Sequence, residues 1–114
     1  MLTIYGIKNC DTMKKARRWL DDAGVAYTFH DYRADGISTD QLAAWCGKVG
    51  WETLLNRRGL TWRKLDDADK QGMDEARAIA LMVEHPALIK RPVLELDDRL
   101  EVGFSPARYE FLLS

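Results

Sequence analysis

The chain has 114 residues, of which 46% are hydrophobic and 31% are charged, and its formal net charge is −1. This length supports one core, so we expect a single domain over residues 1–114, and the composition excludes disordered and fibrous chains. The balanced charge provides no bulk positive field for DNA or RNA. The longest apolar run, residues 78–83, is far shorter than the ~20 residues that cross a bilayer, and no signal peptide is expected. Two cysteines are too few for a disulfide framework, so we expect a cytoplasmic protein. We also expect a monomer that binds neither nucleic acid nor membrane.

The first third of the chain predicts a strand, a helix and a second strand. Leu2–Tyr5 is a short apolar strand that is closed by Gly6. Thr12–Ala23 has apolar residues at steps of three and four, which indicates an amphipathic helix, and Gly24 follows where a left-handed cap is needed. A second strand, Val25–Tyr32, completes a unit that favours a parallel, right-handed crossover.

The middle of the chain predicts a mostly helical insertion over about residues 38–89. The expected helices are Ser38–Gly47 with a capping box to Gln41, Trp51–Asn56, a turn from Thr61 to Leu65, and Asp74–Glu84. The last of these is expected to bury Ala76, Ile79, Ala80 and Val83.

The end of the chain predicts an antiparallel hairpin and a helix. The hairpin strands are Val93–Leu96 and Leu100–Phe104, and Ser105 with Pro106 starts a helix that runs to Leu113. The predicted order is therefore βαβ, a helical middle and ββα.

Cys10 occupies the turn between the first strand and the first helix. Unpaired N–H groups and the helix dipole at this position stabilise a thiolate and lower its pKa. The segment from Lys8 to Arg18 adds five cations against one carboxylate, which also favours a nucleophilic thiolate. Cys46 lies inside a predicted helix and is expected to pack in the core, and no metal site is expected, because the cysteines and histidines match no zinc spacing.

Two motifs carry a resemblance to a known family: the string Tyr5-Gly6-Ile7-Lys8-Asn9-Cys10-Asp11-Thr12, and Leu88-Ile89-Lys90-Arg91-Pro92-Val93. With them the chain resembles the arsenate reductase (ArsC/Spx) family, especially its YffB-type members, over nearly its whole length. The resemblance implies an α/β, thioredoxin-like fold with a four-stranded mixed sheet and the helical insertion. It also implies a cis Pro92, Cys10 as the nucleophile and Arg91 as an anion-binding arginine.

Three departures from the family pattern narrow the expected chemistry. Asn56 and Ser105 stand where arsenate reductases have arginines, and Met13 replaces the second cysteine of the Spx regulators. What remains is a thiol reductase with one cysteine nucleophile and no tightly bound cofactor. Glutathione is the expected co-substrate, with its binding assigned to Lys8, Asn9, Arg57, Arg91 and Pro92.

Two other functions stay open at this point. The first is arsenate reduction with glutathione or glutaredoxin, in which Arg57 replaces a missing guanidinium. Over the two enzymatic readings, the expected substrate is a small thiol, a disulfide or an oxyanion. The second is a non-catalytic regulator that binds RNA polymerase. Trp45, Trp51 and Trp62 could line such an interface, although tryptophans at helical spacing are more often core residues.

Overall fold

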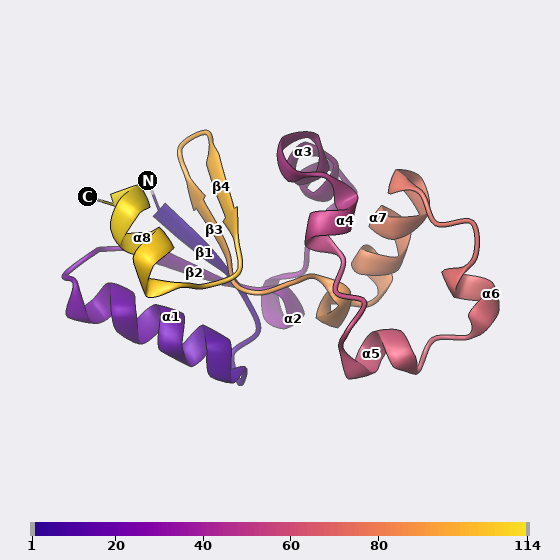
Figure 1. Ribbon diagram of the computed structural model, residues 1–114, viewed down its shortest axis with the longest axis horizontal. Helices are drawn as coiled ribbons and strands as arrows, with labels where there is room; N and C mark the ends of the chain where they lie inside the picture. Colours follow the sequence, from indigo (N-terminus) through magenta and orange to yellow (C-terminus); the bar gives the residue numbers. More distant parts are fainter. Residues whose placement is uncertain (1, 114) are drawn as a thin grey trace. The chain divides into compact units, whose positions relative to one another are not determined.

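The computed structural model describes residues 2–113, and the chain divides into two compact units. The first unit combines the chain up to Tyr32 with the chain from Arg91 onwards, and the second unit is Arg33–Lys90. The elements of the first unit are β1 (Leu2–Gly6), α1 (Asp11–Asp22), β2 (Thr28–Asp31), β3 (Val93–Leu96), β4 (Arg99–Val102) and α8 (Pro106–Leu113) (Figure 1). Between β2 and β3, the chain forms α2 (Tyr32–Asp35), α3 (Thr39–Val49), α4 (Trp51–Leu54), α5 (Leu60–Arg63), α6 (Asp67–Lys70), α7 (Glu75–Glu84) and the 3₁₀ turn η1 (Pro86–Leu88). Within residues 2–113, no helix is both long and apolar enough to span a bilayer.

The first unit is built on a four-stranded mixed sheet in the order β2-β1-β3-β4. β1 pairs with β2 in parallel, whereas the pairs β1–β3 and β3–β4 are antiparallel. The βαβ and ββα halves thus meet at the pairing of the two central strands. This confirms the predicted thioredoxin-like fold.

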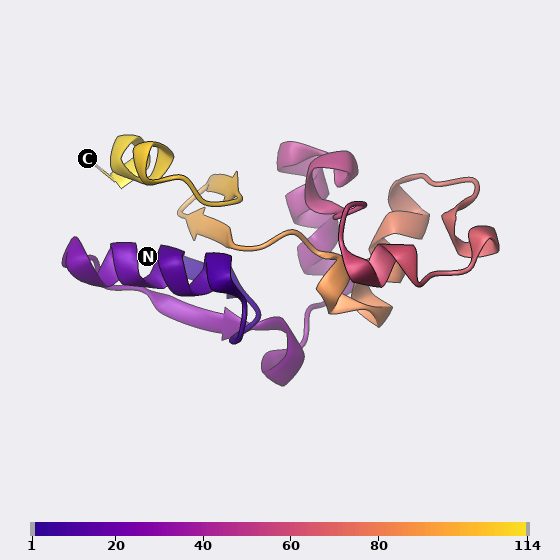
Figure 2. The same ribbon diagram turned by 60° about the horizontal axis from the view of Figure 1, so that its bottom comes forward.

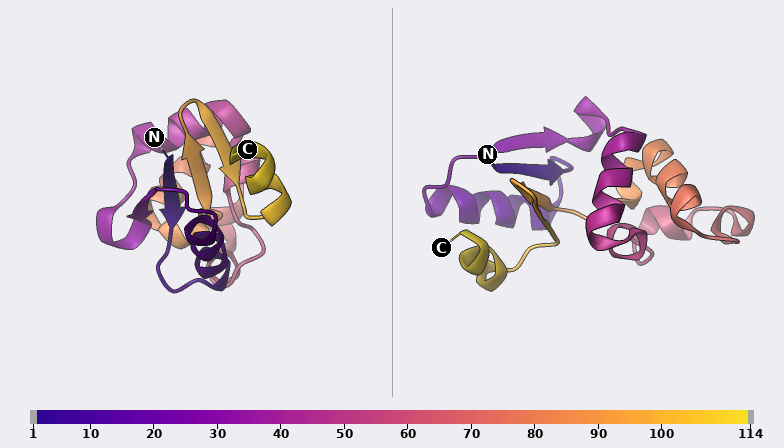
Figure 3. Two further views of the ribbon diagram at one scale, coloured as in Figure 1. Left: turned by 90° about the vertical axis from the view of Figure 1, so that its left-hand side faces the viewer. Right: turned by 90° about the horizontal axis from the view of Figure 1, so that it is seen from above.

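One face of the sheet is covered by α1 and α8 (Figures 2 and 3). Alternate positions of the central strands point to this face, so that Ile4 and Leu94 meet Leu20 of α1 and Tyr109 of α8. All four side chains are at most 2% exposed. Burial of each aliphatic side chain stabilises the unit by about 1.5–3 kcal/mol and fixes α1 against β1.

The second strand is shorter than predicted, because the end of α1 uses part of the segment. The N–H of Gly24 donates to the carbonyl of Asp21, and the N–H of Val25 donates to that of Leu20. Gly24 has a φ of 71°, so the two bonds form the left-handed cap that the sequence predicts. Val25 belongs to this cap, and β2 begins only at Thr28.

The hairpin also differs at its ends. β3 agrees with the prediction, but β4 starts at Arg99 and ends at Val102 instead of Phe104. Gly103 has a φ of 91°, and its N–H donates to the carbonyl of Pro92, so the chain turns away from the sheet there. The predicted cap of the last helix is present, since the Ser105 hydroxyl accepts from the N–H of Arg108 at 3.3 Å.

The second unit is helical, as predicted, with differences at several ends. Ser38 caps α3 through the N–H of Gln41, but the helix continues past Gly47 to Val49, and Gly50, which has a φ of 85°, is its C-cap. Gly59, rather than Thr61, is the N-cap of α5. The short elements α2, α6 and η1 were not predicted from the sequence, since each has at most four residues and offers no periodicity to read.

The predicted buried face of α7 is wrong apart from Ile79. The buried residues are Ala78, Ile79, Leu81 and Met82, whereas Ala76, Ala80 and Val83 are exposed. The apolar run is continuous here, so helical spacing alone leaves the rotation of the helix open. The observed rotation buries the larger side chains Leu81 and Met82 in place of two alanines, which removes more apolar surface from water.

Candidate active site

Cys10 is the N-cap residue of α1 and follows directly on the loop that leaves β1. Gly6 ends the strand at a close approach to this helix, because a Cβ there would overlap the side chain of Met13, which is fully buried. Lys8 and Asn9 are exposed in the loop, whereas Cys10 is partly buried. The sheet and the packing of α1 therefore hold the thiol at the first helical turn.

Several groups act on the pKa of the Cys10 thiol. Partial burial raises it, but the nearby N–H of Met13, side chain of Arg91 and N–H of Thr12 can donate to a thiolate and lower it. Together with the positive charge of Arg91, these donors outweigh burial and lower the pKa below that of an ordinary thiol. Cys10 forms no side-chain capping hydrogen bond of standard geometry in this structure, so these N–H groups favour the thiolate through their proximity at the helix start. The first turn of α1 thus favours a thiolate.

The source of the positive charge differs from the prediction. The sequence assigned it to the cations between Lys8 and Arg18, but Arg91 is the cation that acts on Cys10. Lys14 and Lys15 are exposed on α1, and Arg17 packs on β2, with its guanidinium 4.3 Å from the ring centroid of Phe29. Local charge along the sequence was therefore a poor guide, since the decisive cation is distant in the chain.

Arg91 and Pro92 enter the site from the start of β3. The Arg91–Pro92 peptide bond is cis, as the resemblance implied. Val93 pairs with Tyr5 of β1, so the beginning of β3 lies at the end of β1 that leads to Cys10. The structure thus brings together Cys10, Arg91 and the segment around Pro92.

Tyr32 is a neighbour of this site that the sequence did not single out. Its side chain is 1% exposed, and it stacks with Tyr5 at 6.5 Å between ring centroids. Burial raises the pKa of Tyr32 far above its usual value, while the charge of Arg91 acts in the opposite direction. Only proximity in the fold reveals this residue, because its sequence position reads as the end of a strand.

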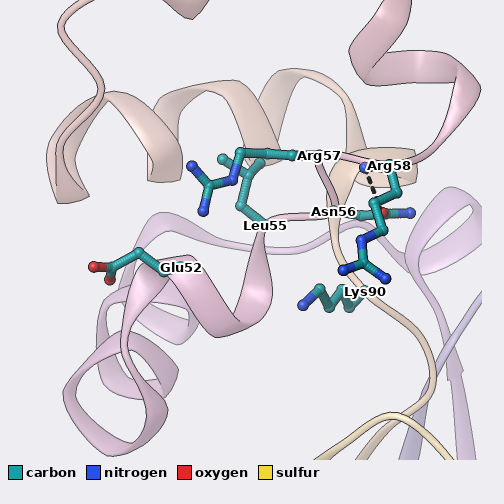
Figure 4. Close-up of a pocket in the computed structure, with 6 residues that line it drawn as sticks. All are labelled: Glu52, Leu55, Asn56, Arg57, Arg58 and Lys90. Atoms are coloured by element: carbon teal, nitrogen blue, oxygen red, sulfur yellow. Dashed lines mark hydrogen bonds between the residues drawn. The ribbon is translucent and has the colours of Figure 1, made fainter.

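Arg57 belongs to the second unit and lies in a different environment. It lines a pocket with Glu52, Leu55, Asn56, Arg58 and Lys90 (Figure 4). Its assignment to the same substrate as Cys10 therefore remains a prediction. Arg58 and Lys90 were not predicted as site residues, although the adjacent arginines before Gly59 were a visible signal.

Cys46 lacks the groups that lower the pKa of Cys10. It lies within α3 and is 5% exposed. Burial raises the pKa of its thiol, and the negative charges of Glu75 and Glu52 raise it further. Both cysteines are free thiols, but the environment of Cys46 favours the neutral, unreactive form.

Comparison with known proteins places this geometry in a family, since the family model described as the ArsC family matches residues 5–112. The chain belongs to the ArsC family. The solved YffB (PA3664) protein is 57% identical, with a TM-score of 0.97 and 100% of each chain covered. An arsenate reductase (ArsC) related protein from Brucella melitensis is 54% identical, with a TM-score of 0.79 over 98% of this chain and 93% of that one.

The curated relatives include an uncharacterized protein and a transcriptional regulator. An uncharacterized protein from Haemophilus influenzae is 43% identical, with 96% of each chain covered. The global transcriptional regulator Spx of Streptococcus mutans is 29% identical over 92% of this chain and 77% of the regulator. Membership of the family therefore includes both arsenate reductase-related proteins and regulators.

Proposed function

We propose that the protein is a glutathione-dependent thiol–disulfide reductase with Cys10 as its only nucleophile. The observation that carries the proposal is the lowered pKa of Cys10, which comes from the first turn of α1 and from Arg91. The thiolate is the reactive form of cysteine, so a site that favours it is prepared for attack on a disulfide. Membership of the ArsC family supports a redox role for this cysteine.

The proposed reaction has two exchange steps. The Cys10 thiolate attacks the glutathione sulfur of a mixed disulfide, a Cys10–glutathione disulfide forms, and the substrate leaves as its thiolate. A second glutathione thiolate then attacks the glutathione sulfur bound to Cys10. This step releases oxidised glutathione and restores the Cys10 thiolate. Overall, the mixed disulfide and one added glutathione thiolate give the substrate thiolate and oxidised glutathione, so the glutathione thiolate is the reductant and no other is needed.

Arg91 and the residues around it would bind the glutathione. The Arg91 guanidinium carries the charge that a glutathione carboxylate needs, and Lys8 and Asn9 are exposed in the loop before Cys10. The main chain before the cis Pro92 would pair with the peptide backbone of glutathione as an added strand does.

Arsenate reduction is the second enzymatic candidate, favoured by the relation to arsenate reductase-related proteins. Two positions argue against it. The Ser105 hydroxyl accepts the capping bond of α8, and the side-chain amide oxygen of Asn56 accepts the N–H of Arg58 at 3.1 Å, so both side chains have structural roles. Neither supplies a guanidinium to a compact oxyanion. We expect arsenate reduction to be weak or absent, which an assay of arsenite release with glutathione and glutaredoxin would measure.

A regulator like Spx is the third candidate, and it rests on the curated relatives. Met13, at the position of the Spx second cysteine, is fully buried and cannot form a local disulfide with Cys10. Trp45 is 1% exposed and belongs to the core. Trp51 and Trp62 are partly exposed, but each is faced by a cation of its own unit, Arg57 and Lys70 respectively.

The proposal is tested by mass spectrometry after exposure to oxidised glutathione. We expect one glutathione adduct, located on Cys10 by peptide mapping. Cys10→Ser should abolish the adduct, and Cys46→Ser is the matched control that should retain it. An adduct on Cys46, or robust arsenate reduction by the unmodified protein, would contradict the assignment.

A further inference from the structure

The second unit contains a positively charged pocket that the chemistry proposed for Cys10 does not use. The pocket has a volume of about 330 Å³ and brings the cations Arg57, Arg58 and Lys90 together with one carboxylate, Glu52. This volume lies at the lower end of the range for ligand pockets, ~300–1,000 Å³, and exceeds what a single oxyanion fills. Its size fits a small organic molecule.

Among the described residues 2–113, no carboxylate forms a salt bridge with any of the three cations. Glu52, which lines the same pocket, also forms none with them. Arg57 instead lies over the ring of Trp51, with 5.6 Å between its guanidinium carbon and the ring centroid. Like charges that share a pocket repel one another, and a bound anion would remove this repulsion.

The backbone beneath the pocket is fixed. Leu55 and Ile89 form an isolated antiparallel bridge, in which the N–H of Asn56 donates to Leu88 at 2.7 Å and the N–H of Lys90 donates to Leu54 at 2.8 Å. The bridged residues Leu55 and Ile89 are at most 1% exposed. Arg58 and Lys90 therefore start from anchored segments that are far apart in the sequence.

The turn that carries both arginines is also fixed. The side-chain oxygen of Asn56 accepts the N–H of Arg58, which is the bond of an Asx turn. A Cβ at Gly59 would come within 2.9 Å of the Asn56 side-chain nitrogen, so the Asn56 side chain lies close against this glycine. Figure 4 shows Arg58 extending toward Lys90, whereas Arg57 extends away from them. The backbone that carries these cations is therefore ordered before a ligand binds, so binding does not have to order it.

We propose that this pocket binds a small organic anion with two or more negative charges. A guanidinium pairs with a carboxylate or a phosphate through two parallel hydrogen bonds, and an ammonium adds a compact charge. Arg58 and Lys90 hold the anionic groups, and Arg57 extends the positive surface at the rim. The site lies within the second unit and requires no chemistry at Cys10.

An NMR titration tests this proposal without any thiol chemistry. The full chain with Cys10→Ser is titrated at constant ionic strength with citrate, with glycerol 3-phosphate, and with glycerol as the neutral control. We expect saturable shifts of the backbone amides of residues 55–58 and 90 with at least one of the two anions. Binding by citrate alone identifies a carboxylate ligand, and binding by glycerol 3-phosphate alone identifies a phosphate ligand.

Two variants separate the pocket from general surface charge. Within the described part of the chain, Arg58 forms hydrogen bonds through its backbone atoms alone, so Arg58→Gln should keep the fold while weakening binding by about tenfold or more. Lys48→Gln, which removes one exposed charge from α3, should leave binding unchanged. Failure of both anions to saturate, shifts spread over the exposed cations of the chain, or equal effects of the two variants would overturn the proposal. None of these results depends on whether Cys10 reacts with glutathione.

Discussion

Replacement of Arg91 by alanine is the perturbation that most directly separates the contributions to the Cys10 site. The thiolate has two backbone donors, from Met13 and Thr12, and one side-chain donor, from Arg91. Arg91→Ala removes one donor and the neighbouring charge, and leaves the first turn of α1 in place. The thiol should therefore become less acidic without losing its helical position.

The size of the effect follows from the nature of the contact. A hydrogen bond to a charged group contributes about 1.5–3 kcal/mol. Cys10 and Arg91 are both partly exposed, so solvent screening favours the lower end of this range. A loss of about 1.5 kcal/mol slows glutathionylation at neutral pH by about tenfold.

The assay compares two reagents over a range of pH. Iodoacetamide carries no carboxylate, so with this reagent Arg91→Ala acts only through the thiolate. Oxidised glutathione carries carboxylates, so its rate also reports binding to Arg91. Above the pKa of the variant thiol, the iodoacetamide difference should vanish or reverse, because a more basic thiolate is the better nucleophile.

Arg91→Lys and Arg99→Ala are the matched controls. Lysine keeps the charge but not the planar fork, so Arg91→Lys should react at an intermediate rate. Arg99 is exposed on β4, and its removal should change neither rate. If Arg91→Ala reacts as fast as the unmodified protein, or if Arg99→Ala slows the reaction equally, Arg91 does not stabilise the thiolate.

Three further results are expected. Gly6→Ala should destabilise the protein by about 1–3 kcal/mol in a urea titration, because its new methyl group meets the buried Met13, and an unchanged midpoint would show that Met13 can move aside. Cys46 should resist iodoacetamide until the protein unfolds, since burial raises the pKa of its thiol, and alkylation of the folded protein at the rate of Cys10 would contradict its core position. Because folding lowers the pKa of Cys10, its contribution to stability is fully present above the pKa of an unfolded thiol and is lost as the pH falls through the lower, folded value. Cys10→Ser should flatten the stability curve over that interval, and an unaltered curve would show that folding does not change the titration of Cys10.

Much of the fold could be predicted because several local signals agree. The Gly24 cap and the Ser38 and Ser105 caps each use bonds between residues close in the sequence, so the local pattern determines them. The rotation of α7 could not be predicted, since Leu81, Met82 and Val83 are all apolar and only tertiary packing selects among them.

The candidate site could likewise be predicted only in part from the sequence. The place of Cys10 at a helix start depends on local sequence, and the structure agrees with it. The cation beside Cys10 could not be predicted from local sequence, because Arg91 reaches Cys10 only through the pairing of β1 with β3. The pocket with Arg58 and Lys90 depends likewise on a bridge between residues 34 positions apart, Leu55 and Ile89.

The proposed reaction depends on the fold lowering the pKa of the Cys10 thiol below that of a free thiol. The most direct test is the pH dependence of the alkylation rate in the Cys46→Ser variant, in which Cys10 is the only thiol left to react. We predict a single titration with a pKa below that of a free thiol, lost when the protein is unfolded in urea. A pKa equal to or above that of a free thiol in the folded protein would contradict the claim.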